Sequence, residues 1–406
     1  MAAMKIAIDM RSLQTRGMFR GVGVHWREIL RQLAVIDSRN QYFLLYASNC
    51  ASADDQIRYP ANFKRIFIRI PRFPRGSAIP WLWLIDPVVR ARLMEHRQVD
   101  VFVDTTFADL VFPSAPLSGC RNLLWIYDLI PWIFQDRFVA RQRLAFLKRM
   151  MLRIKLANAT RATAVITSSE STRQDFHTRS GYSLDRVKVV PLGVDPLFFD
   201  PPAARTGELR GQPELPDRYI LFVGALDPHK NLPLALEAYA QVSRLQEIPP
   251  LLIVGRVDTD RHIQRILTGQ LIEMGLTDRV RFLDWLTVEH LAAVYSAADY
   301  LLFPTLYEGF GLPALEAMAA GCPVLTSNVS SLPEVVGDCA VLVDPLEARS
   351  IADGMLLLGS DPDFRKNLAG RGRHRARNFT WRRTAESFLS CLEDVGGGAG
   401  RSESSN

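Results

Sequence analysis

The chain has 406 residues, a formal net charge of +6 and an isoelectric point near 9.1, and 48% of its residues are hydrophobic. This length is enough for two domains, each with a full hydrophobic core. No apolar run reaches the roughly 18 residues that a membrane-spanning helix needs. The N-terminus, "MAAMKIAIDM", does not have the pattern of a signal peptide. The positive charge favours anionic partners, such as nucleotides, phospholipid or nucleic acid.

The cysteines indicate neither a disulfide framework nor a zinc site. They are scattered and lack CxxC spacing: Cys50, Cys120, Cys322, Cys339 and Cys391. An odd number at irregular spacing suggests a reducing compartment, so we expect a cytoplasmic protein. Asp258 and Asp260 form an Asp-x-Asp pattern, a pair of carboxylates that can bind a metal ion. Thr259 and Asp260 more simply cap the following helix, and we predict no required metal.

Strand and helix patterns alternate along the first half of the chain. Short apolar or β-branched runs, typical of buried parallel strands, occur at 5–10, 42–47, 63–70, 99–104, 122–128 and 164–169. Helical patterns at 23–36 and 143–160 lie between some of them, and "RVKVVPLGVD" closes the series. This alternation predicts an N-terminal Rossmann-like domain over residues 1–195.

A second alternation follows a segment rich in proline, glycine and charge at 196–217, which we predict to be a linker. Its strand patterns are "RYILFVGA", "PLLIVGR", "RVRFLDW" and "YLLFPT", and its helices begin near Leu232, Arg261 and Val288. We therefore predict a second doubly wound domain at 218–375. A ligand is expected between the two domains, at the carboxyl ends of their strands.

The C-terminal part of the chain is predicted to return to the first domain. A helix at 376–395 would pack back on the N-terminal domain, and the tail at 396–406 is flexible by composition.

The stretch "LYEGFGLPALEAMAAG" at 306–321 follows a predicted strand and has the features of an anion site. Gly309 and Gly311 let the backbone come close to a ligand, while Pro313 and Gly321 suit the start and the end of a short helix. The start of a helix offers unpaired N–H groups and a positive dipole end. We therefore expect an anion to bind here.

Two carboxylates in this stretch need a different ligand, because a carboxylate does not bind a phosphate. Glu308 and Glu316 are eight positions apart. Carboxylates recognise vicinal hydroxyls well, so a sugar and a ribose that flank a diphosphate would suit both. The alternative is that Glu308 is a solvated loop residue and Glu316 a helix-surface residue.

Two further segments are candidate phosphate contacts. "VGALDPHKNL" places His229 and Lys230 just before a helix, where a lysine can neutralise diphosphate charge; alternatively, Lys230 lies on a solvated turn. "FRGVGVHWREIL" places Gly21 and Gly23 in a short glycine loop ahead of a helix. This Gly-x-Gly lacks the third glycine of the dinucleotide fingerprint, which disfavours a dinucleotide-dependent oxidoreductase.

The motifs together resemble the family 4 retaining glycosyltransferases, which have the GT-B fold. "EGFGLPALEAMAAGCPVLTSN" with "SLPEVVGDCAVLVDP" is similar to the family's E-x7-E signature region. "GALDPHKNLPLALEAY", "WLTVEHLAAVYSAADYLLFPT", "VVPLGVD" and "FRGVGVHWREIL" fall in the family's order, so the likeness covers roughly residues 4–390. It implies two Rossmann-like doubly wound α/β domains that face each other across a cleft. Less specifically, the chain resembles the bacterial branch that builds O-antigen and capsule polysaccharides, where GDP-mannose-type donors are common.

The resemblance implies a role for each candidate residue. Glu316 would bind the ribose hydroxyls and Glu308 the transferred hexose, while Lys230 and the amides around Gly311 would hold the diphosphate. Gly23 would admit the diphosphate from the other domain. The implied catalytic residues are Glu308, Lys230 and Asp128. The implied donor-binding residues are Gly23, His229, Lys230, Glu308, Gly309, Phe310, Gly311, Leu312 and Glu316.

The chain departs from the family pattern at three positions. Many members have an arginine where this chain has Ala225, and His229 stands in place of another arginine. Diphosphate charge would then rest more on Lys230, with Arg256 as a further candidate. In "IYDLIP", Tyr127 replaces a histidine that commonly touches the donor sugar. Asp128 either contacts the sugar or caps a turn.

The resemblance implies a retaining transferase that moves a mannose- or rhamnose-type hexose from a nucleoside diphosphate sugar, with GDP favoured over UDP. The acceptor would be a growing, lipid-linked cell-surface polysaccharide such as O-antigen. Lys230 and the helix-end amides would stabilise the leaving nucleoside diphosphate, and same-face attack would retain the configuration. The nucleotide sugar is a substrate, so no cofactor is expected, and no nucleic acid partner is predicted.

Three alternatives stay open. A UDP-sugar-dependent transferase of the same fold would use the same residues. An epimerase or a phosphorylase of the GT-B fold is a second possibility, although a phosphorylase needs a cofactor lysine that we do not identify. A non-catalytic partner subunit is the third; loss of Glu308 or Lys230 would favour it, and both residues are present.

A basic amphipathic pattern at 141–157 predicts contact with the inner face of the cytoplasmic membrane. Its cations lie among leucine, phenylalanine, methionine and isoleucine: Arg141, Arg143, Lys148, Arg149, Arg153 and Lys155. Trp81 and Trp83, near arginines, resemble interfacial tryptophans. The alternative is a domain helix whose basic face is simply solvated.

Overall fold

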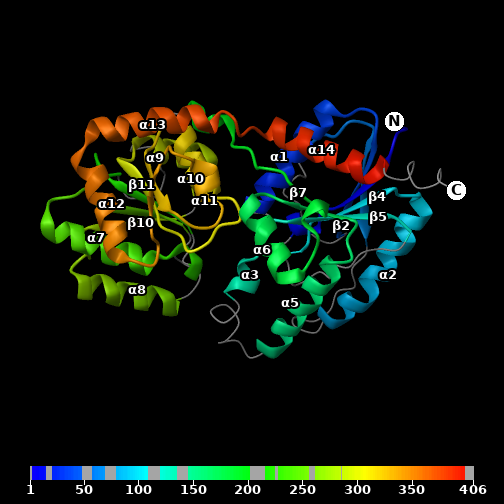
Figure 1. Ribbon diagram of the computed structural model, residues 1–406, viewed down its shortest axis with the longest axis horizontal. Helices are drawn as coiled ribbons and strands as arrows, with labels where there is room; N and C mark the ends of the chain where they lie inside the picture. Colours follow the sequence, from blue (N-terminus) through cyan, green and yellow to red (C-terminus); the bar gives the residue numbers. More distant parts are fainter. Residues whose placement is uncertain are drawn as a thin grey trace. The chain divides into compact units, whose positions relative to one another are not determined.

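The structure is a computed structural model, which describes residues 2–14, 21–47, 57–68, 79–107, 119–134, 145–201, 215–224, 227–255, 261–284 and 286–397. It divides the chain into two compact units (Figure 1). Unit 1 contains Met1–Gly193 and Trp381–Asn406, and unit 2 contains Val194–Thr380. The chain therefore passes between the units twice. Val194 and Thr380, the two ends of unit 2, pair in a parallel bridge, and the Val194 N–H donates to the carbonyl of Phe379 at 3.1 Å.

The start of the predicted linker belongs to unit 2. It forms the short 3-10 helix η4 (Pro196–Phe199), which packs on helices α9 and α10 of that unit. The side chain of Asp195 caps η4 by accepting the N–H of Leu197 at 2.9 Å. Residues 202–214 of the predicted linker lie outside the described residues.

Unit 1 is built on a parallel sheet with strand order β3-β2-β1-β4-β5-β6-β7. The strands are β1 (Lys5–Asp9), β2 (Gln41–Ala47), β3 (Phe63–Ile68), β4 (Val101–Asp104), β5 (Arg121–Ile126), β6 (Ala164–Thr167) and β7 (Val187–Val189). The central strands are almost continuous apolar runs because helices cover both faces of such a sheet. The sequence analysis predicted these strands, with ends that differ by a few residues.

The described helices of unit 1 lie between these strands or, in the case of the C-terminal helix, after unit 2. They are η1 (Arg11–Gln14), α1 (Gly21–Ile36), α2 (Ile79–Arg97), α3 (Ile130–Ile133), α5 (Ala145–Ala159), α6 (Glu170–Ser180), η3 (Leu184–Arg186) and α14 (Trp381–Gly397). Local caps fix some of their ends. Ser169 accepts the N–H of Thr172 at the start of α6, and Gly181 ends that helix with φ of +70°.

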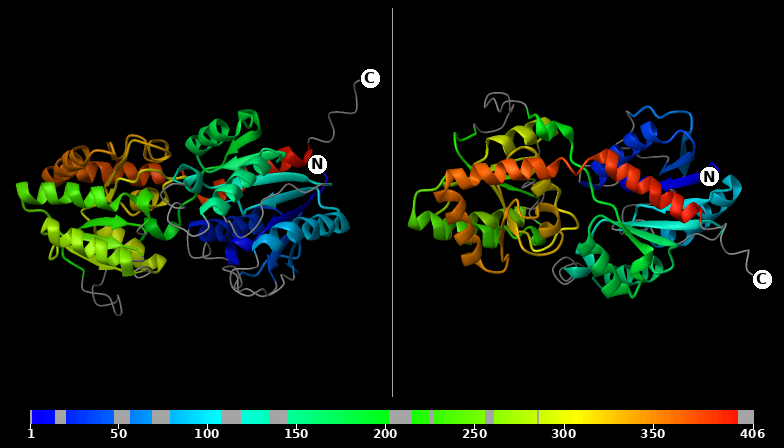
Figure 2. Two further views of the ribbon diagram at one scale, coloured as in Figure 1. Left: turned by 90° about the horizontal axis from the view of Figure 1, so that it is seen from below. Right: turned by 45° about the horizontal axis from the view of Figure 1, so that its top comes forward.

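The C-terminal helix α14 packs on α1 and on strands β4 and β5 of unit 1, as the red helix beside α1 in Figure 1 and Figure 2 illustrates. The predicted helix at 376–395 is shorter at its start in the structure, because the preceding helix ends at Ala376 and α14 begins at Trp381. Its ring surfaces complete an aromatic cluster formed by His25, Trp26, Trp125, Tyr127, Trp381 and Phe388. Burial lowers the pKa of His25 to about 3, so this imidazole is neutral at physiological pH.

The glycines expected to form a loop ahead of the first helix lie inside it. Helix α1 begins at Gly21, so Gly21 and Gly23 occupy its first turn. The prediction of a loop was wrong because glycine's low helix propensity is a weak signal that tertiary packing overrides. The inward side chains of α1, among them Trp26, Ile29, Leu30 and Leu33, are fully buried.

Helix α5 contains the described part of the basic surface predicted at 141–157. The prediction that Lys155 belongs to this surface was wrong. Lys155 is fully buried, and its Nζ donates to the carbonyls of Thr106 at 2.7 Å and Phe107 at 3.0 Å. It lies on the inward row of the helix with the buried residues Met151 and Ala159. Lys155 therefore cannot contact a membrane surface, whereas Arg153 is exposed. Arg141 and Arg143, and the side chains of Trp81 and Trp83, lie outside what the structure describes.

Unit 2 is built on a second parallel sheet, with strand order β10-β9-β8-β11-β12-β13. The strands are β8 (Ile220–Val223), β9 (Leu251–Val254), β10 (Val280–Leu283), β11 (Tyr300–Phe303), β12 (Val324–Ser327) and β13 (Val341–Val343). The helices are η4, η5 (Pro228–Lys230), α7 (Leu232–Leu245), α8 (Arg261–Met274), α9 (Val288–Ala297), α10 (Leu312–Ala319), α11 (Leu332–Val336), α12 (Ala348–Ser360) and α13 (Pro362–Ala376). The sequence analysis predicted β8 to β11 but did not identify β12 and β13 as strands.

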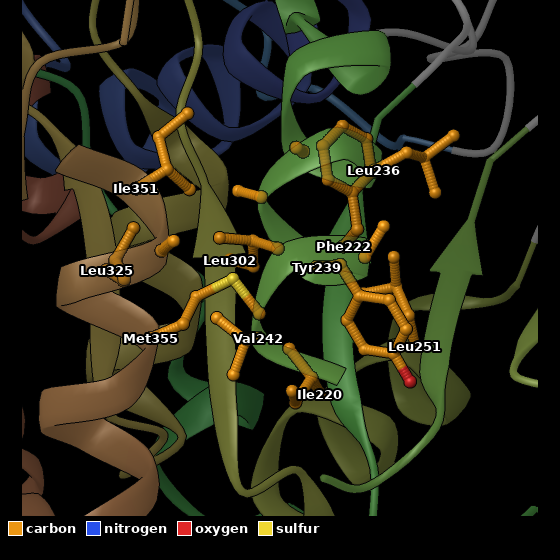
Figure 3. Close-up of a cluster of buried hydrophobic side chains, with 14 of the residues drawn as sticks. Ile220, Phe222, Leu236, Tyr239, Val242, Leu251, Leu302, Leu325, Ile351 and Met355 are labelled. Atoms are coloured by element: carbon orange, nitrogen blue, oxygen red, sulfur yellow. The ribbon is translucent and has the colours of Figure 1, made fainter. Parts of the chain in front are cut away.

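A hydrophobic core lies between this sheet and two helices, α7 and α12 (Figure 3). Strand residues Ile220, Phe222, Leu251, Leu302 and Leu325 meet Leu236, Tyr239 and Val242 of α7 and Ile351 and Met355 of α12. Burial of each large apolar side chain stabilises the fold by roughly 1.5–3 kcal/mol. This core holds the sheet rigidly, so the loops at its carboxyl edge have a fixed base.

Among the described residues, no helix has the length and apolar character required to cross a bilayer.

Candidate functional site

The candidate site lies at the carboxyl edge of the unit 2 sheet, where the strand order reverses. Strand β8 continues to β9 and β10 on one side, and β11, β12 and β13 follow on its other side. In doubly wound sheets, ligands bind at this switch point, beyond the carboxyl ends of the strands. Helix η5, which carries Lys230, follows β8, and the loop that carries Glu308 follows β11. The two segments that the sequence predicts to bind the ligand therefore follow neighbouring strands.

Lys230 and Glu308 form an ion pair at this edge. The Nζ of Lys230 donates to Oε1 of Glu308 at 2.7 Å. Their side chains are 14% and 10% exposed, so the pair is shielded but still open to solvent. The Lys230 ammonium also lies 5.2 Å from the ring centroid of Phe303, the last residue of β11. The structure thus brings together two predicted site residues that are 78 positions apart in the sequence.

The position of Lys230 is fixed by its neighbours. The N–H of Leu306 donates to the carbonyl of His229 at 2.7 Å, which joins η5 to the loop after β11. Asn231 has φ of +60°, and its side-chain amide donates to the carbonyls of Pro304 and Pro345. These contacts hold η5 against two other loops of the same edge. The His229 side chain is buried, so it is not exposed for contact with a ligand.

Gly224, the residue after β8, gives the lysine stem its path. A Cβ at this position would lie 3.3 Å from Cγ and Cδ of Lys230, closer than ordinary van der Waals contact. The backbone of Gly224 also has φ of +155°, a value that residues other than glycine rarely adopt. Gly224 therefore leaves the space that the Lys230 side chain occupies, a role that the sequence analysis did not assign.

The loop after β11 is held by two serines that the sequence analysis did not single out. The N–H of Glu308 donates to Oγ of Ser330 at 3.0 Å, and Oγ of Ser331 donates to the carbonyl of Glu308 at 3.0 Å. Ser330 itself has a left-handed backbone with φ of +54°. The backbone of Glu308 is thus fixed on both sides, and the ion pair with Lys230 holds its carboxylate.

Gly311 allows helix α10 to begin close to the loop. It is the N-cap residue with φ of +102°, and a Cβ there would come within 2.8 Å of a methyl carbon of Leu332. Pro313 lies in the first turn of α10 and Gly321 has φ of +74° just beyond its end, as predicted from the sequence. The start of α10 has the amide groups and dipole end that favour an anion.

Phe310 contributes to the loop by packing. Its side chain is buried and meets the ring of Phe379 at 6.0 Å between centroids. The structure thus directs this predicted donor-binding side chain into the protein, so only its backbone is suited to contact a ligand.

Glu316 lies on α10, where Oε2 accepts the hydroxyl of Tyr295 at 3.2 Å. Burial raises the pKa of Glu316 to about 7, the negative charge of Asp195 adds to this effect, and the Tyr295 hydrogen bond and the Lys230 charge oppose it. The carboxyl group therefore titrates near neutral pH in the absence of a ligand. Tyr295 and Asp195 carry no local sequence signal for this contact, because they lie 21 and 121 positions away.

Two predicted site residues belong to unit 1 and are described within it. Gly23 is buried in the first turn of α1. Asp128 accepts the N–H of Ile130 at 2.9 Å, a turn contact beside the start of the short helix α3, which fits the alternative that Asp128 caps a turn. Tyr127, which stands in place of a family histidine, is buried in the aromatic cluster, and burial raises the pKa of its hydroxyl far above the usual value.

Some residues singled out in the sequence analysis, namely one departure from the family pattern, one candidate cation and the two candidate metal ligands, are not described by the structure. Ala225, Arg256, Asp258 and Asp260 lie outside the described residues. Within the described ranges, no group of three or more histidine, cysteine, aspartate or glutamate side chains is arranged to hold a metal ion.

Two family models match the chain, one on each half. Residues 19–197 match the model described as Glycosyltransferase Family 4, and residues 208–375 match the model described as Glycosyl transferases group 1. Together the matches cover the described parts of both sheets with the exception of β1, which precedes them.

Two relatives from Escherichia coli are similar in sequence. The serotype-specific mannosyltransferase WbdA is 32% identical over 96% of this chain and 48% of the relative. O-antigen chain mannosyltransferase B is 32% identical over 54% of this chain and 58% of the relative. The chain therefore spans about half the length of the curated relatives it matches.

The fold is also similar to solved structures. A structure of Anabaena HepE in complex with UDP and glucose superimposes with a TM-score of 0.71 at 19% identity, covering 96% of this chain and 100% of that chain. At this identity the similarity establishes the fold alone, which is the predicted architecture of two doubly wound α/β units.

Proposed function

Since the chain belongs to family 4 of the glycosyltransferases, we propose that it transfers a hexose from a nucleoside diphosphate sugar to a growing cell-surface polysaccharide. The observation that carries this proposal is the ion pair of Lys230 and Glu308. It lies at the switch point of the unit 2 sheet, and the loop of Glu308 leads directly into the N-terminus of α10. This edge combines a cation and an anion-binding helix start with a carboxylate for hydroxyl groups.

The two members of the pair would exchange partners when the donor binds. The diphosphate attracts the Lys230 ammonium, and a hydroxyl of the hexose donates to the Glu308 carboxylate. Lys230 and Glu308 each have a partner both before and after the donor binds. This avoids the free-energy cost of an unpaired charge that is shielded from water. The amides at the start of α10 would share the diphosphate charge with Lys230. Glu316 would accept the ribose hydroxyls.

The rate would come mainly from stabilising the leaving group. As the glycosidic bond ionises, negative charge grows on the nucleoside diphosphate, and Lys230 interacts with that charge more strongly in the transition state than in the ground state. We assign Glu308 to hydroxyl binding rather than to attack on the anomeric carbon. Same-face attack by the acceptor hydroxyl, with retention of configuration, is therefore the proposed course.

GDP-linked mannose or rhamnose-type sugars are the proposed donors, and a lipid-linked glycan is the proposed acceptor. The names of the two Escherichia coli relatives, both mannosyltransferases, support a hexose of this type. A UDP-sugar donor remains the alternative, because the similar Anabaena structure holds UDP. We propose that the reaction needs no metal.

Helix α5 supports a peripheral position on an anionic membrane. Three apolar side chains spaced by four residues are exposed along it: Phe146, Met150 and Ile154, of which Phe146 is 82% exposed. Arg149 and the exposed Arg153 flank this row. An apolar row beside cations suits the boundary between headgroups and acyl chains, and a protein docked there would reach lipid-linked glycans.

The testing experiment incubates the full chain with GDP- and UDP-linked hexoses and a short soluble mannan acceptor, and measures nucleoside diphosphate release and the glycan product. We expect release and product with a GDP-sugar, unchanged by EDTA. Release with a UDP-sugar alone would select the alternative donor. Nucleotide binding without release or product from any donor would favour a non-catalytic partner subunit. Activity that is abolished by EDTA and restored by Mn²⁺ would overturn metal independence and return attention to Asp258 and Asp260.

A further inference from the structure

We propose that Tyr295 and Asp195 are positioning residues for Glu316, which together set the orientation and the charge of the carboxyl group that meets the nucleoside. This inference rests on the proposed function, because it takes Glu316 to be the ribose-binding group. It adds two residues that lie in motifs quoted above but were given no role there, and it makes nucleotide binding depend on a proton.

Tyr295 supplies the orientation. Its side chain is fully buried on α9, and its hydroxyl donates to Oε2 of Glu316 at 3.2 Å. The ring packs against Phe198 of η4, with 5.9 Å between centroids, so the tyrosine is fixed from the other side. A carboxylate held through one oxygen keeps its second oxygen in a defined direction for a ligand hydroxyl.

Asp195 supplies a negative charge that acts on Glu316. Its carboxylate accepts the N–H of Leu197 at 2.9 Å and caps η4, the short helix that packs on both α9 and α10. The two carboxylates repel each other, so Asp195 favours the protonated form of Glu316. The tyrosine hydroxyl favours the ionised form by donating to it.

Among the described residues, Lys230 from η5 is the remaining charge that acts on Glu316, and it favours the ionised form. Helix α13 meets α10 where Gly372 faces Met318, and α11 meets it where Leu332 faces Gly311. Burial is the largest influence and places the pKa of the free carboxyl at about 7. At physiological pH, Glu316 is therefore divided between its two forms.

The ribose diol donates hydrogen bonds best to the ionised form, because a carboxylate accepts through both oxygens. Nucleotide binding therefore releases a proton from the part of the population that is protonated. Affinity should be constant above about pH 7 and should fall about tenfold per pH unit well below it. The terminal phosphate of the nucleotide also titrates at about pH 6. Because it is common to every titration, a change of the midpoint between wild type and a variant reports the charge state of Glu316.

The two positioning residues make opposite predictions. Tyr295→Phe removes the donor that stabilises the ionised form, so the midpoint moves to higher pH. Asp195→Asn removes the repelling charge but keeps an oxygen that can cap η4, so the midpoint moves to lower pH. A residue with a merely structural role would change the affinity at every pH and leave the midpoint in place.

The experiment is isothermal titration calorimetry of the full chain with GDP, and separately with UDP, between pH 5.5 and 8.5, in two buffers of different ionisation enthalpy. Two variants are matched controls. Tyr219→Phe removes a buried hydroxyl that donates to the carbonyl of Val294 on α9, the helix that carries Tyr295. Asp361→Asn replaces the N-cap aspartate of α13. Both controls should retain the wild-type midpoint. Circular dichroism checks that each variant is folded, and Asp195→Asn tests the inference alone if Tyr295→Phe does not fold.

Shifts of opposite sign, with proton release by wild type below pH 7, support the inference. Equal midpoints in all proteins, or shifts of the same sign, overturn it, as does the absence of nucleotide binding at any pH. A separate assay of nucleoside diphosphate release from the donor sugar distinguishes the two proposals. Opposite shifts without turnover would uphold this inference and overturn the proposed transferase, whereas turnover with fixed midpoints would do the reverse.

Discussion

Each unit has an ion pair beyond the carboxyl end of its first strand, and the two pairs differ in their access to solvent. In unit 1, Arg11 donates from Nη2 to Oδ2 of Asp9 at 2.6 Å and from Nε to Oδ1 at 2.8 Å, and Arg90 lies 3.5 Å from the same carboxylate. All three side chains are fully buried. In unit 2, Lys230 and Glu308 keep partial exposure.

This difference separates a structural pair from a candidate functional one. A fully buried carboxylate between two guanidinium groups cannot share its charge with an incoming ligand, so its contribution is to the folded state. A pair that water still reaches can exchange one partner for a diphosphate or a hydroxyl. The same position in two related sheets is thus used for stability in unit 1 and, as we propose, for chemistry in unit 2.

The largest expected effect is the loss of the buried pair. Asp9→Ala leaves two buried guanidinium groups without this carboxylate, which should lower the free energy of unfolding by about 3–5 kcal/mol. Thermal or urea unfolding measures the loss. Arg218→Ala is the control, because it breaks an exposed pair with Asp299 and should cost no more than about 1 kcal/mol. Equal losses in the two variants would remove the distinction between buried and exposed pairs.

The pH dependence of stability sharpens the same point. Burial opposes the charge of Asp9, but Arg11 and Arg90 outweigh it and lower the pKa of this carboxyl below its usual value of 3.8. A lowered pKa in the folded state gives stability that is present above 3.8 and is lost as the pH falls through the folded value. Wild type should therefore lose stability below pH 3.8 more steeply than Asp9→Ala.

The next effect is on turnover. Lys230→Ala should reduce kcat by about 10²–10³-fold at saturating donor, because the growing diphosphate charge loses its cation. The unfolding free energy should change less than in Asp9→Ala, since water still reaches Glu308. Lys188→Ala, which removes a lysine from an exposed pair with Asp394, should leave kcat unchanged. A smaller loss of kcat than that caused by Glu316→Ala would assign the electrostatic role to another cation.

A smaller effect is expected on binding. Glu316→Ala should weaken GDP binding by about 1.5–3 kcal/mol at pH 8, because the ribose loses a charged acceptor. Calorimetry with the nucleotide alone is the measurement, and Glu237→Ala, on the exposed surface of α7, is the control. An unchanged affinity in a folded Glu316→Ala protein would exclude this residue from the nucleotide site.

The smallest effect concerns the surface of α5 rather than its buried lysine. Each arginine near an anionic membrane contributes about 1 kcal/mol to binding, so reversing Arg149 and Arg153 to glutamate should release the protein from vesicles that contain anionic lipid. Co-sedimentation across a salt series measures this release, since screening weakens the attraction. Transfer to a short soluble acceptor should continue. If wild type stays in the supernatant at low salt, α5 presents only a solvated face.

Much of the fold could be predicted because its signals are local. Apolar runs indicated the strands of unit 1, and the helix predicted from about Leu232 begins at that residue. Gly311, predicted to be a position of close backbone approach, has φ of +102°. β12 and β13 are no shorter than several strands that were predicted, so their length does not explain why they were missed. Both lie inside the signature stretches 308–328 and 331–345, which were interpreted for their chemistry and not as strands. Contacts between distant segments were not predictable. Lys155 has the sequence context of a surface cation, and only the packed loop at Thr106 turns it inward.

The site follows the same division. Lys230, Glu308 and Glu316 lie in motifs whose residue types indicate their chemistry. Tyr295 and Asp195 lie in quoted motifs too, but only the fold shows that Tyr295 donates to Glu316 and that the charge of Asp195 acts on it. Ser330 and Ser331 are likewise visible only through their hydrogen bonds to the backbone of Glu308.

The bridge between Val194 and Thr380 has a consequence for modularity. Unit 2 is one uninterrupted segment whose two ends are hydrogen-bonded neighbours, so it enters and leaves the chain at a single place. Such an insertion can be exchanged for an equivalent segment from a relative without moving the flanking ends apart. Unit 1, in contrast, is assembled from two separate stretches and needs α14 to cover its aromatic cluster. The donor preference that we propose for unit 2 would therefore be the more portable property of this chain, because the segment that carries it has adjoining termini.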